Sequence, residues 1–288
     1  MSVLGVDIGG TKIAAGAVTD EACVVHGVTV PTRAAEGYDV SIGQVYRAIG
    51  ECLSAGVRAI GICAPGPLNP KTGVVLNPPN LPGWCNVPLA DLVCERFGLP
   101  TRVENDANAA GLAEVRFGAA RGFGSVLYVT LSTGIGAGII LDGKIYHGKN
   151  GAAAEGGHVT IDWRSDTICN CGTPGCIEAL ASGSAIAKRG RTPEQIADGV
   201  ARGDGESLRI LDEIATMLGA WMGSMISLLD PDIIVVGGGV SRIGEPLFSR
   251  LRRIAPSRTI NQFAAVTPIV PAKLAENVGI IGAASVVL

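Results

Sequence analysis

The stretch that decides the fold is Val3-Leu-Gly-Val-Asp-Ile-Gly-Gly-Thr-Lys-Ile-Ala-Ala-Gly-Ala-Val18, in which two apolar runs flank a tight polar segment. Apolar runs of this length on either side of a glycine turn predict two strands, at residues 3–6 and 13–18. The adjacent Gly9 and Gly10 would let backbone N–H groups approach a phosphate closely. An ordinary hairpin turn explains the same loop, so both interpretations stay open. Neither the Walker A nor the GxGxxG pattern occurs here.

The same order of an apolar run and a glycine-rich loop recurs along the chain. Runs at 58–63, 126–131 and 233–236 end in Ala-Pro-Gly-Pro, Ser-Thr-Gly-Ile-Gly-Ala-Gly and Gly-Gly-Gly. Helical spacing of apolar residues follows at 41–55, 89–97, 107–117 and 206–229, and Thr192-Pro-Glu-Gln is a capping box that starts another helix. This alternation predicts an α/β fold whose ligands bind at the carboxyl ends of the strands.

Two later glycine loops are further candidates for contacts with a nucleotide. The loop that contains Thr133 and Gly134 is a weak signal alone, but a polyphosphate could be held between it and the first loop. The loop that contains Gly238 and Gly239 could leave space for a nucleobase. Close packing of a helix on a strand explains that third loop as well.

A polar cluster, Glu104-Asn-Asp-Ala-Asn108, precedes an alanine-rich helix and follows a short strand at 101–103. One of its side chains could be only the helix N-cap. A cap needs one side chain, however, and four polar ones gather here. An Asp in this place, Asp106, can accept the proton of an attacking hydroxyl, and Asn105 can hydrogen-bond a neighbouring hydroxyl.

Composition limits the classes of partner. The chain has 288 residues, 47% hydrophobic and 17% charged, with a net charge of −3. This composition is typical of a globular protein of one large or two modest domains, and it offers no basic surface for nucleic acid or anionic lipid. The sequence shows no signal peptide and no apolar run long enough to span a membrane, so we expect a cytoplasmic protein.

Three of the eight cysteines form a pattern with a histidine. Zinc in structural sites takes four N or S ligands in a tetrahedron, and the sequence supplies them close together as His158, Cys169, Cys171 and Cys176. Because the set is complete, it leaves no position for a catalytic water, and we expect a structural zinc knuckle beside Glu155 and Glu178. The other five, Cys23, Cys52, Cys63, Cys85 and Cys94, are expected to be buried thiols.

Taken in order, these motifs resemble the ROK family of repressors, open reading frames and kinases. The resemblance rests on Asp7-x-Gly-Gly-Thr-Lys, Pro65-Gly-Pro, Asn80-Leu-Pro-Gly-Trp, Glu104-Asn-Asp-Ala-Asn-Ala, Ser132-Thr-Gly-Ile-Gly, Glu155-x-Gly-His, CxCGxxGCxE and Gly237-Gly-Gly. It implies the actin-like ATPase (ribonuclease H-like) fold, with two α/β lobes and a nucleotide and sugar cleft between them. We expect residues 1–116 and 276–288 to form the small lobe and 117–275 the large lobe with the knuckle.

The resemblance also implies roles for individual residues. Asp106 would be the general base for a sugar hydroxyl, most often the 6-OH, and His158 would ligate zinc through one ring nitrogen and meet the sugar with the other. The sugar contacts implied are Gly66, Asn80, Asn105, Asp106, Glu155, His158 and Glu178. The contacts implied for ATP and its Mg²⁺ are Asp7, Gly9, Gly10, Thr11, Lys12, Thr133, Gly134, Gly238 and Gly239.

The expected activity is therefore an ATP-dependent hexose kinase, with glucose as the favoured sugar. The alternatives are N-acetylmannosamine, N-acetylglucosamine, fructose or another hexose, and polyphosphate is an alternative donor. A repressor is not expected, because those relatives carry a helix-turn-helix domain before the first loop. A dinucleotide oxidoreductase would leave the knuckle unexplained. The resemblance favours a homodimer, with a tetramer as the alternative.

Two features depart from the family pattern. Members commonly have glycine before the glutamate of the Glu155 motif and a bulky aliphatic residue after it, where this chain has Ala154 and Gly156. The backbone that aims Glu155 is expected to differ, with consequences for sugar preference. The segment 184–192 is also shorter than in many relatives.

Overall fold

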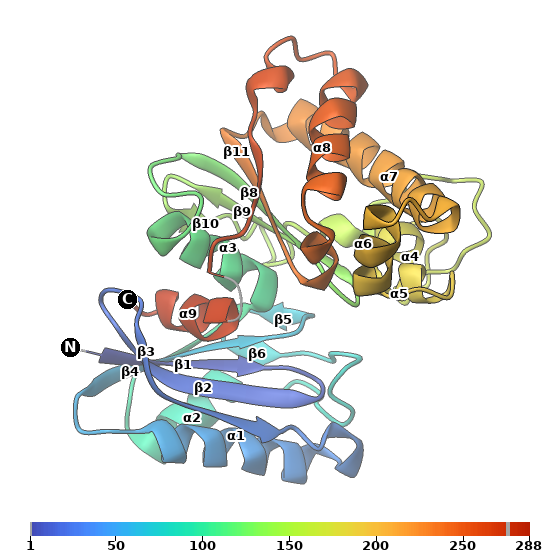
Figure 1. Ribbon diagram of the computed structural model, residues 1–288. Coiled ribbons are helices and arrows are strands. Elements are labelled where there is room, and N and C mark those ends of the chain that lie inside the picture. The colour runs from blue at the N-terminus through green and yellow to red at the C-terminus, as the bar shows by residue number, and fades with distance from the viewer. Residues whose placement is uncertain (1, 275–276) are drawn as a thin grey trace. The chain divides into compact units, whose positions relative to one another are not determined.

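The computed structural model describes residues 2–274 and 277–288 (Figure 1). By its contacts the chain divides into two compact units, one made of Met1–Arg121, Gly138–Ala153 and Leu274–Leu288 and the other of Gly122–Ala137 and Ala154–Lys273. Each unit combines helices with a sheet, which confirms the α/β class. The predicted lobe boundaries, 1–116 with 276–288 and 117–275, stay a prediction, and the second of them falls at 275–276, outside the described residues.

The first unit is built on a five-stranded sheet of order β3-β2-β1-β4-β7. β1 is antiparallel to β2, and β2 to β3, whereas β4 runs parallel to β1 and to β7. The predicted strands of this unit are all present, and a two-stranded β5-β6 sheet follows β4. The bounds are β1 Ser2–Ile8, β2 Lys12–Thr19, β3 Val24–Pro31, β4 Val57–Ala64, β5 Leu68–Asn69, β6 Val74–Val75 and β7 Thr101–Asn105.

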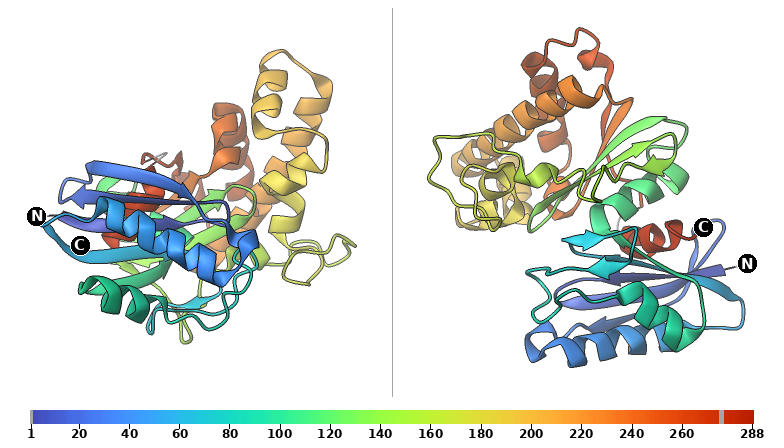
Figure 2. Two further views of the ribbon diagram at one scale, coloured as in Figure 1. Left: turned by 90° about the horizontal axis from the view of Figure 1, so that it is seen from below. Right: turned by 180° about the vertical axis from the view of Figure 1, so that it is seen from behind.

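Helices cover both faces of this sheet. α1 (Tyr38–Cys52) and α2 (Leu89–Phe97) lie on one face, and α9 (Val278–Ser285) lies on the other, with α3 (Asp106–Phe117) packed against it (Figure 2). α9 comes very close to the sheet: a Cβ at Gly61 would overlap the carbonyl oxygen of Ala283, and one at Gly5 that of Ile280. Gly5 on β1 and Gly61 on β4 therefore allow α9 to pack this closely against the sheet.

The second sheet has the order β10-β9-β8-β11-β12. β11 runs parallel to both β8 and β12, as the hydrophobic runs in β8 and β11 predict. The bounds are β8 Ser125–Leu131, β9 Ile135–Leu141, β10 Lys144–Ile145, β11 Ile233–Gly237 and β12 Ile269–Pro271.

In the second unit the long helix α7 packs against α4, α6 and α8. Its apolar side chains, among them Ile210, Ile214 and Trp221, are buried as their spacing predicts, and the Thr192 capping box at the start of α6 is present. The bounds are α4 Ile177–Ala181, α5 Gly183–Ala187, α6 Pro193–Ala201, α7 Gly205–Leu229 and α8 Glu245–Ile254.

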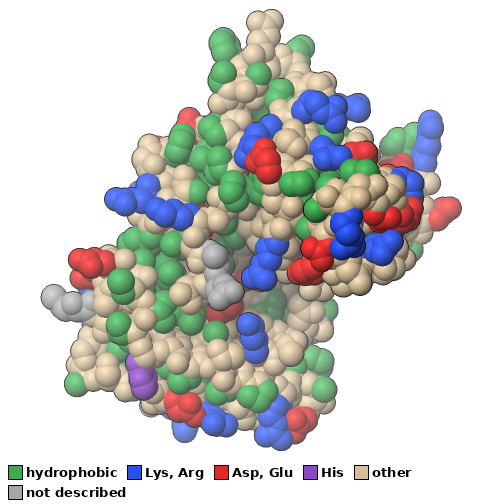
Figure 3. Space-filling view, viewed as in Figure 1, with side chains coloured by type: hydrophobic (Ala, Val, Ile, Leu, Met, Phe, Trp, Pro, Cys, Tyr) green, Lys and Arg blue, Asp and Glu red, His purple; other side chains and the backbone are tan. Residues whose placement is uncertain are grey.

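Among residues 2–274 and 277–288, no helix is long and apolar enough to cross a bilayer. Basic and acidic side chains lie interspersed on the face shown in Figure 3. Neighbouring charges pair, for example Arg209 with Glu206 and Arg250 with Asp212.

The prediction that five cysteines are buried thiols is wrong for three of them. Cys52 and Cys63 are buried, but Cys23, Cys85 and Cys94 are exposed. Cys23 lies in the turn between β2 and β3, Cys85 lies in a loop, and Cys94 lies on the outer side of α2. Apolar neighbours in the sequence do not determine which side of a turn or a short helix faces the solvent.

Candidate functional site

The first glycine loop joins β1 to β2 and is a hairpin turn, closed by a 2.9 Å hydrogen bond from the Gly9 N–H to the Lys12 carbonyl. The Thr32 hydroxyl donates to the Gly9 carbonyl at 2.6 Å. A Cβ at Gly10 would lie 3.0 Å from the Asn80 carbonyl oxygen, closer than carbon and oxygen normally pack. A residue predicted to contact phosphate thus lies against one predicted to contact sugar, and Thr11 and Lys12 remain exposed.

Asp7, at the carboxyl end of β1, is held by two other elements. The Cys63 thiol on β4 donates to Asp7 Oδ1 at 3.3 Å, and a Cβ at Gly279 in α9 would overlap Asp7 Oδ2. Burial raises the pKa of the Asp7 carboxyl, while the Cys63 hydrogen bond and the Lys12 charge act in the opposite direction. Gly66, in the turn that follows β4, is half-buried.

At the junction of β7 and α3, the N-cap and the proposed general base are different residues. Asn105 is the N-cap: its Oδ1 accepts the N–H groups of Ala107 at 2.9 Å and Asn108 at 3.2 Å. That leaves the side-chain amide nitrogen of Asn105 as its donor. Asp106 is the first residue of α3, and its side chain is exposed. The N-cap explanation therefore accounts for Asn105, and Asp106 Oδ1 also accepts the Ala107 N–H at 2.8 Å.

In the second unit, Glu178 and the second glycine loop lie together. Glu178 Oε2 accepts the Ile135 N–H at 2.9 Å, and a Cβ at Gly134 would overlap the same oxygen. The loop is also held from α5, where the Gly183 N–H donates to the Ser132 carbonyl at 2.7 Å. A side chain at position 134 would therefore displace the Glu178 carboxylate from this loop.

The third glycine loop combines packing with open space. Gly238 has a φ of 87°, and a Cβ there would overlap the carbonyl oxygen of Leu131 at the end of β8. Close packing therefore accounts for Gly238. A Cβ at Gly239 would meet no atom within 4 Å among the described residues. In this loop, position 239 therefore has space for a ligand, whereas position 238 does not.

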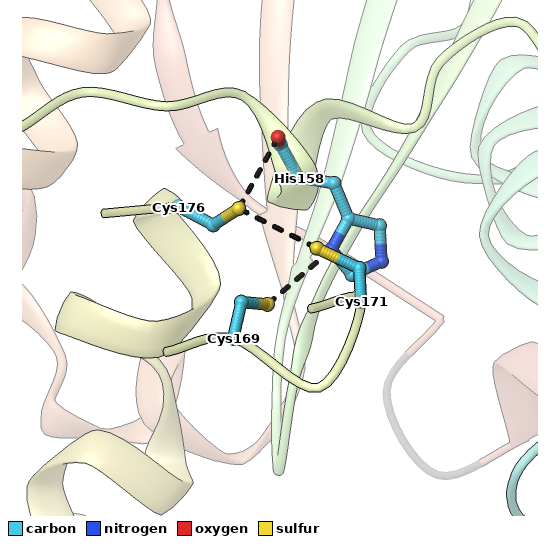
Figure 4. Close-up of side chains that lie close together, drawn as sticks. All are labelled: His158, Cys169, Cys171 and Cys176. Carbon is cyan, nitrogen blue, oxygen red and sulfur yellow. Dashed lines mark hydrogen bonds between the residues drawn. The ribbon is translucent and has the colours of Figure 1, made fainter. Parts of the chain in front are cut away.

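The knuckle residues converge from three short segments. Figure 4 shows the thiols of Cys169, Cys171 and Cys176 gathered around the imidazole of His158. One ligand atom from each residue can be chosen so that all four lie within 4.8 Å of one another. Cys169 Sγ is 3.5 Å from His158 Nδ1, and Cys171 Sγ is 3.6 Å from Cys176 Sγ.

These separations fit a tetrahedral zinc site. With Zn–S near 2.3 Å and Zn–N near 2.0–2.1 Å, the edges of the tetrahedron would be about 3.8 Å between sulfurs and about 3.6 Å between sulfur and nitrogen. His158 faces the thiols with Nδ1, so its Nε2 is the nitrogen free to meet another group. Cys169 Sγ also lies 3.6 Å from Glu178 Oε1, which connects the knuckle to the second glycine loop through one carboxylate.

The turn that carries Glu155 has Ala154 before it and Gly156 after it. Ala154 has a φ of 69°, in the left-handed region that favours glycine. A Cβ at Gly156 would lie 3.0 Å from the Trp221 indole, so that ring occupies the space beside Gly156. Glu155 itself is exposed and immediately precedes the short helical turn Gly156–His158.

A buried pair at the β7–α3 junction was not predicted. Glu104 Oε2 lies 2.6 Å from His147 Nε2, and its Oε1 accepts the Asn105 N–H at 2.9 Å and the Asn108 side-chain N–H at 3.0 Å. Glu104 is an acid in β7 beside the buried Val103, and a buried acid needs a partner. Nothing in the sequence identifies that partner, because His147 lies 43 positions away.

Comparisons with known proteins agree with the motifs. The ROK family model matches residues 3–288. A glucokinase of Thermotoga maritima is 36% identical over 100% of this chain and 97% of its own length. The crystal structure of a ROK family glucokinase from Streptomyces griseus in complex with glucose and AMPPNP is 35% identical, with a TM-score of 0.85 over 99% of both chains.

A ROK hexokinase from Thermus thermophilus is 36% identical to this chain, with a TM-score of 0.82 over 99% of this chain and 97% of its own. The fold is therefore the two-lobed actin-like ATPase fold of these relatives. With a family model that matches nearly every residue and relatives of this similarity over their full lengths, the chain belongs to the ROK family.

Proposed function

We propose that the protein is an ATP-dependent hexose kinase that transfers the γ-phosphoryl group to the 6-OH of glucose. The observation that carries the proposal is full-length similarity to a glucokinase and to a kinase structure with glucose and AMPPNP. The local structure supports it, because Asp106 is an exposed carboxylate at the start of a helix whose cap is a separate residue.

In this proposal Asp106 takes the proton of the 6-OH as the hydroxyl attacks the γ-phosphorus. Asp106 carries an exposed carboxylate, and phosphoryl transfer asks chiefly for a positioned nucleophile and for neutralised charge. The other sugar hydroxyls are met by the remaining sugar contacts, with His158 donating from Nε2. The full set is Gly66, Asn80, Asn105, Glu155, His158 and Glu178.

The nucleotide contacts proposed are the loop amides of Gly9, Gly10 and Thr11, the Thr133–Gly134 loop, and Lys12, Gly238 and Gly239. Mg²⁺ accompanies ATP and neutralises phosphate charge, and Asp7 would hold its hydration shell. Zinc would be held by His158, Cys169, Cys171 and Cys176. Its role would be structural, because it fixes the direction of the His158 ring and the position of Glu178.

We also propose that the kinase acts in the cytoplasm, where ATP is available, as a homodimer that supplies phosphorylated glucose to glycolysis. The family resemblance supports the dimer, and size-exclusion chromatography with light scattering distinguishes it from a tetramer.

The proposal is tested with a panel of sugars and the purified protein. Glucose, mannose, fructose, N-acetylglucosamine and N-acetylmannosamine are each supplied with ATP or polyphosphate, and ADP or phosphosugar formation is measured. We expect the highest kcat/KM with glucose and ATP. A higher kcat/KM for an N-acetylated sugar would change the assigned substrate but leave the assignment as a kinase in place. If the protein transfers phosphate to no hexose, the proposed function is wrong.

A further inference from the structure

The side chain of Glu104 is the most enclosed carboxylate near the proposed general base. Glu104 is 2% exposed and lies at the end of β7, two residues before Asp106. Its two oxygens take hydrogen bonds from the Asn105 backbone, the Asn108 side chain and the His147 ring. A buried carboxylate is tolerated only when it is paired and hydrogen-bonded, so these three contacts decide where Glu104 sits.

Two of the contacts act on the residues around Asp106. The Asn105 N–H is fixed from one side by Glu104, while the Asn105 side chain caps α3 on the other. Asn108 is 3% exposed and its Oδ1 has no hydrogen-bond partner in the described part of the chain, so Glu104 is what orients this amide. The first turn of α3, on which Asp106 stands, is therefore tied to one carboxylate.

His147 reaches Glu104 from a separate piece of chain. It follows β10 within the segment Gly138–Ala153, which belongs by its contacts to the first unit. The same segment touches α3 a second time, since a Cβ at Gly138 would lie 2.8 Å from the Ala107 carbonyl oxygen. The Ala153 N–H closes the loop by donating to the His147 carbonyl at 3.2 Å. The His147 ring is held where it meets Glu104, with its side chain 30% exposed.

We propose that His147 is a positioning residue for the phosphoryl transfer: through Glu104 it fixes the backbone of Asn105 and the first turn of α3, and so the direction of the Asp106 carboxylate. The inference rests on the proposed function, because it assigns His147 to the general base of that reaction. His147 touches neither sugar nor nucleotide in this proposal, and its effect on the rate passes through Glu104.

The Glu104–His147 pair also predicts that kcat falls as the pH becomes alkaline. The hydrogen bond that the His147 ring makes to the Glu104 carboxylate raises the pKa of His147, while burial and the charge of Lys71, in the turn between β5 and β6, act in the opposite direction. α3 presents only the neutral amide of Asn108 to the same carboxylate. A raised pKa means that the contribution of the pair is complete below the ordinary histidine pKa and is lost as pH rises through the folded-state value.

His147→Gln is the first test, with His26→Gln as the matched control, because His26 is exposed and its ring bonds the Glu51 carbonyl, away from Glu104. Because His147 acts through Glu104 on the position of the Asp106 carboxylate, we expect kcat to fall by about 10-fold, equivalent to about 1.4 kcal/mol, while the glucose KM changes little. The decline of kcat at alkaline pH should disappear in His147→Gln and in Glu104→Gln. The double variant should lose no more activity than Glu104→Gln alone.

Nuclear magnetic resonance of the three histidine rings separates this inference from the proposed function. If the protein phosphorylates no hexose, the proposed function fails, but the titration of His147 still tests the pair: we expect a raised pKa that returns to the ordinary range in Glu104→Gln. A His147 pKa unaffected by Glu104→Gln overturns the pairing. Kinetics of His147→Gln identical to those of His26→Gln, with the alkaline limb intact, overturn the positioning role.

Discussion

Asp106 stands at the first position of a helix whose cap is made by its neighbour. Asn105 Oδ1 caps α3 by accepting the Ala107 and Asn108 N–H groups, and Asp106 Oδ1 also accepts the Ala107 N–H at 2.8 Å. The partial positive charge at a helix N-terminus favours the ionised form of an acid placed there. A general base must be ionised before it can accept a proton, so this position suits the role proposed for Asp106.

Replacing Asp106 by Asn should remove the proton acceptor while keeping nearly the same shape. We expect kcat to fall by about 10²- to 10⁴-fold with glucose affinity nearly unchanged. Steady-state kinetics and calorimetric titration with glucose measure the two quantities. Asp39→Asn is the matched control, since Asp39 is also an acid in the first turn of a helix, α1. Near-normal turnover in Asp106→Asn would remove Asp106 from the mechanism.

Ala154 carries backbone strain, because its φ lies in the left-handed region that favours glycine. At a φ of 69°, an alanine side chain crowds its own carbonyl, at a cost of about 1–2 kcal/mol. Ala154→Gly should therefore raise the free energy of unfolding by about 1 kcal/mol, measured by urea denaturation. Ala153→Gly is the control: Ala153 is not among the positive-φ residues, so that change should destabilise. If Ala154→Gly lowers the free energy of unfolding as Ala153→Gly does, the backbone at Ala154 is not strained.

At the scale of elements, the knuckle is joined to the second glycine loop through α4. Glu178, two residues after Cys176, lies 3.6 Å from Cys169 Sγ through Oε1 and accepts the Ile135 N–H with Oε2. Carboxylates near a metal site commonly orient its ligands. Here the Glu178 carboxylate also reaches the loop proposed to hold phosphate. Disorder in the knuckle should therefore weaken the binding of both the sugar and ATP.

Cys171→Ala should therefore lose zinc and glucose binding together, and raise the KM for ATP as well. Zinc is measured by elemental analysis of the purified variant, and glucose by calorimetry. Cys94→Ala removes an exposed thiol far from the ligand set in sequence and should leave zinc content and affinities unchanged. Loss of zinc with intact glucose affinity would show that the metal does not hold His158 and Glu178 in place.

The elements that could be predicted are those whose signal is local. Strands β1, β2, β4, β8 and β11 follow apolar runs, and α7 follows its buried stripe, so each lies within a few residues of its predicted bounds. The clustering of His158, Cys169, Cys171 and Cys176 could be predicted because all four lie within a short stretch of sequence. The Glu104–His147 pair could not, because it depends on how the segment Gly138–Ala153 folds back onto α3.

At the scale of the molecule, the C-terminal helix completes the sheet made by the beginning of the chain. Ile280 and Ala284 of α9 are buried together with Val3 and Val18 of β1 and β2. The approach is so close that it requires glycine in the sheet beneath, at positions where any side chain would meet the helix backbone. Stability of the first unit therefore depends on contacts between the two ends of the chain.

Gly61→Ala tests this closeness, because its Cβ would overlap the Ala283 carbonyl oxygen. Overpacking of this kind costs about 1–3 kcal/mol, so the midpoint of urea denaturation should fall clearly. Gly50→Ala is the control: a Cβ at Gly50 in α1 meets no described atom within 4 Å, and alanine there should stabilise the helix by about 0.5–1 kcal/mol. Equal midpoints for Gly61→Ala and the unchanged protein would mean that α9 lies farther from the sheet.

The ribosome synthesises α9 after the strands that it covers, which affects how the first unit folds. Strands β1 to β7 are synthesised before α9, so the face that α9 covers waits for Val278–Ser285. Until then the nascent first unit exposes the apolar residues that α9 buries in the finished protein. Completion of this unit therefore comes after its sheet has left the ribosome, and a nascent chain that stalls before α9 should be a substrate for chaperones.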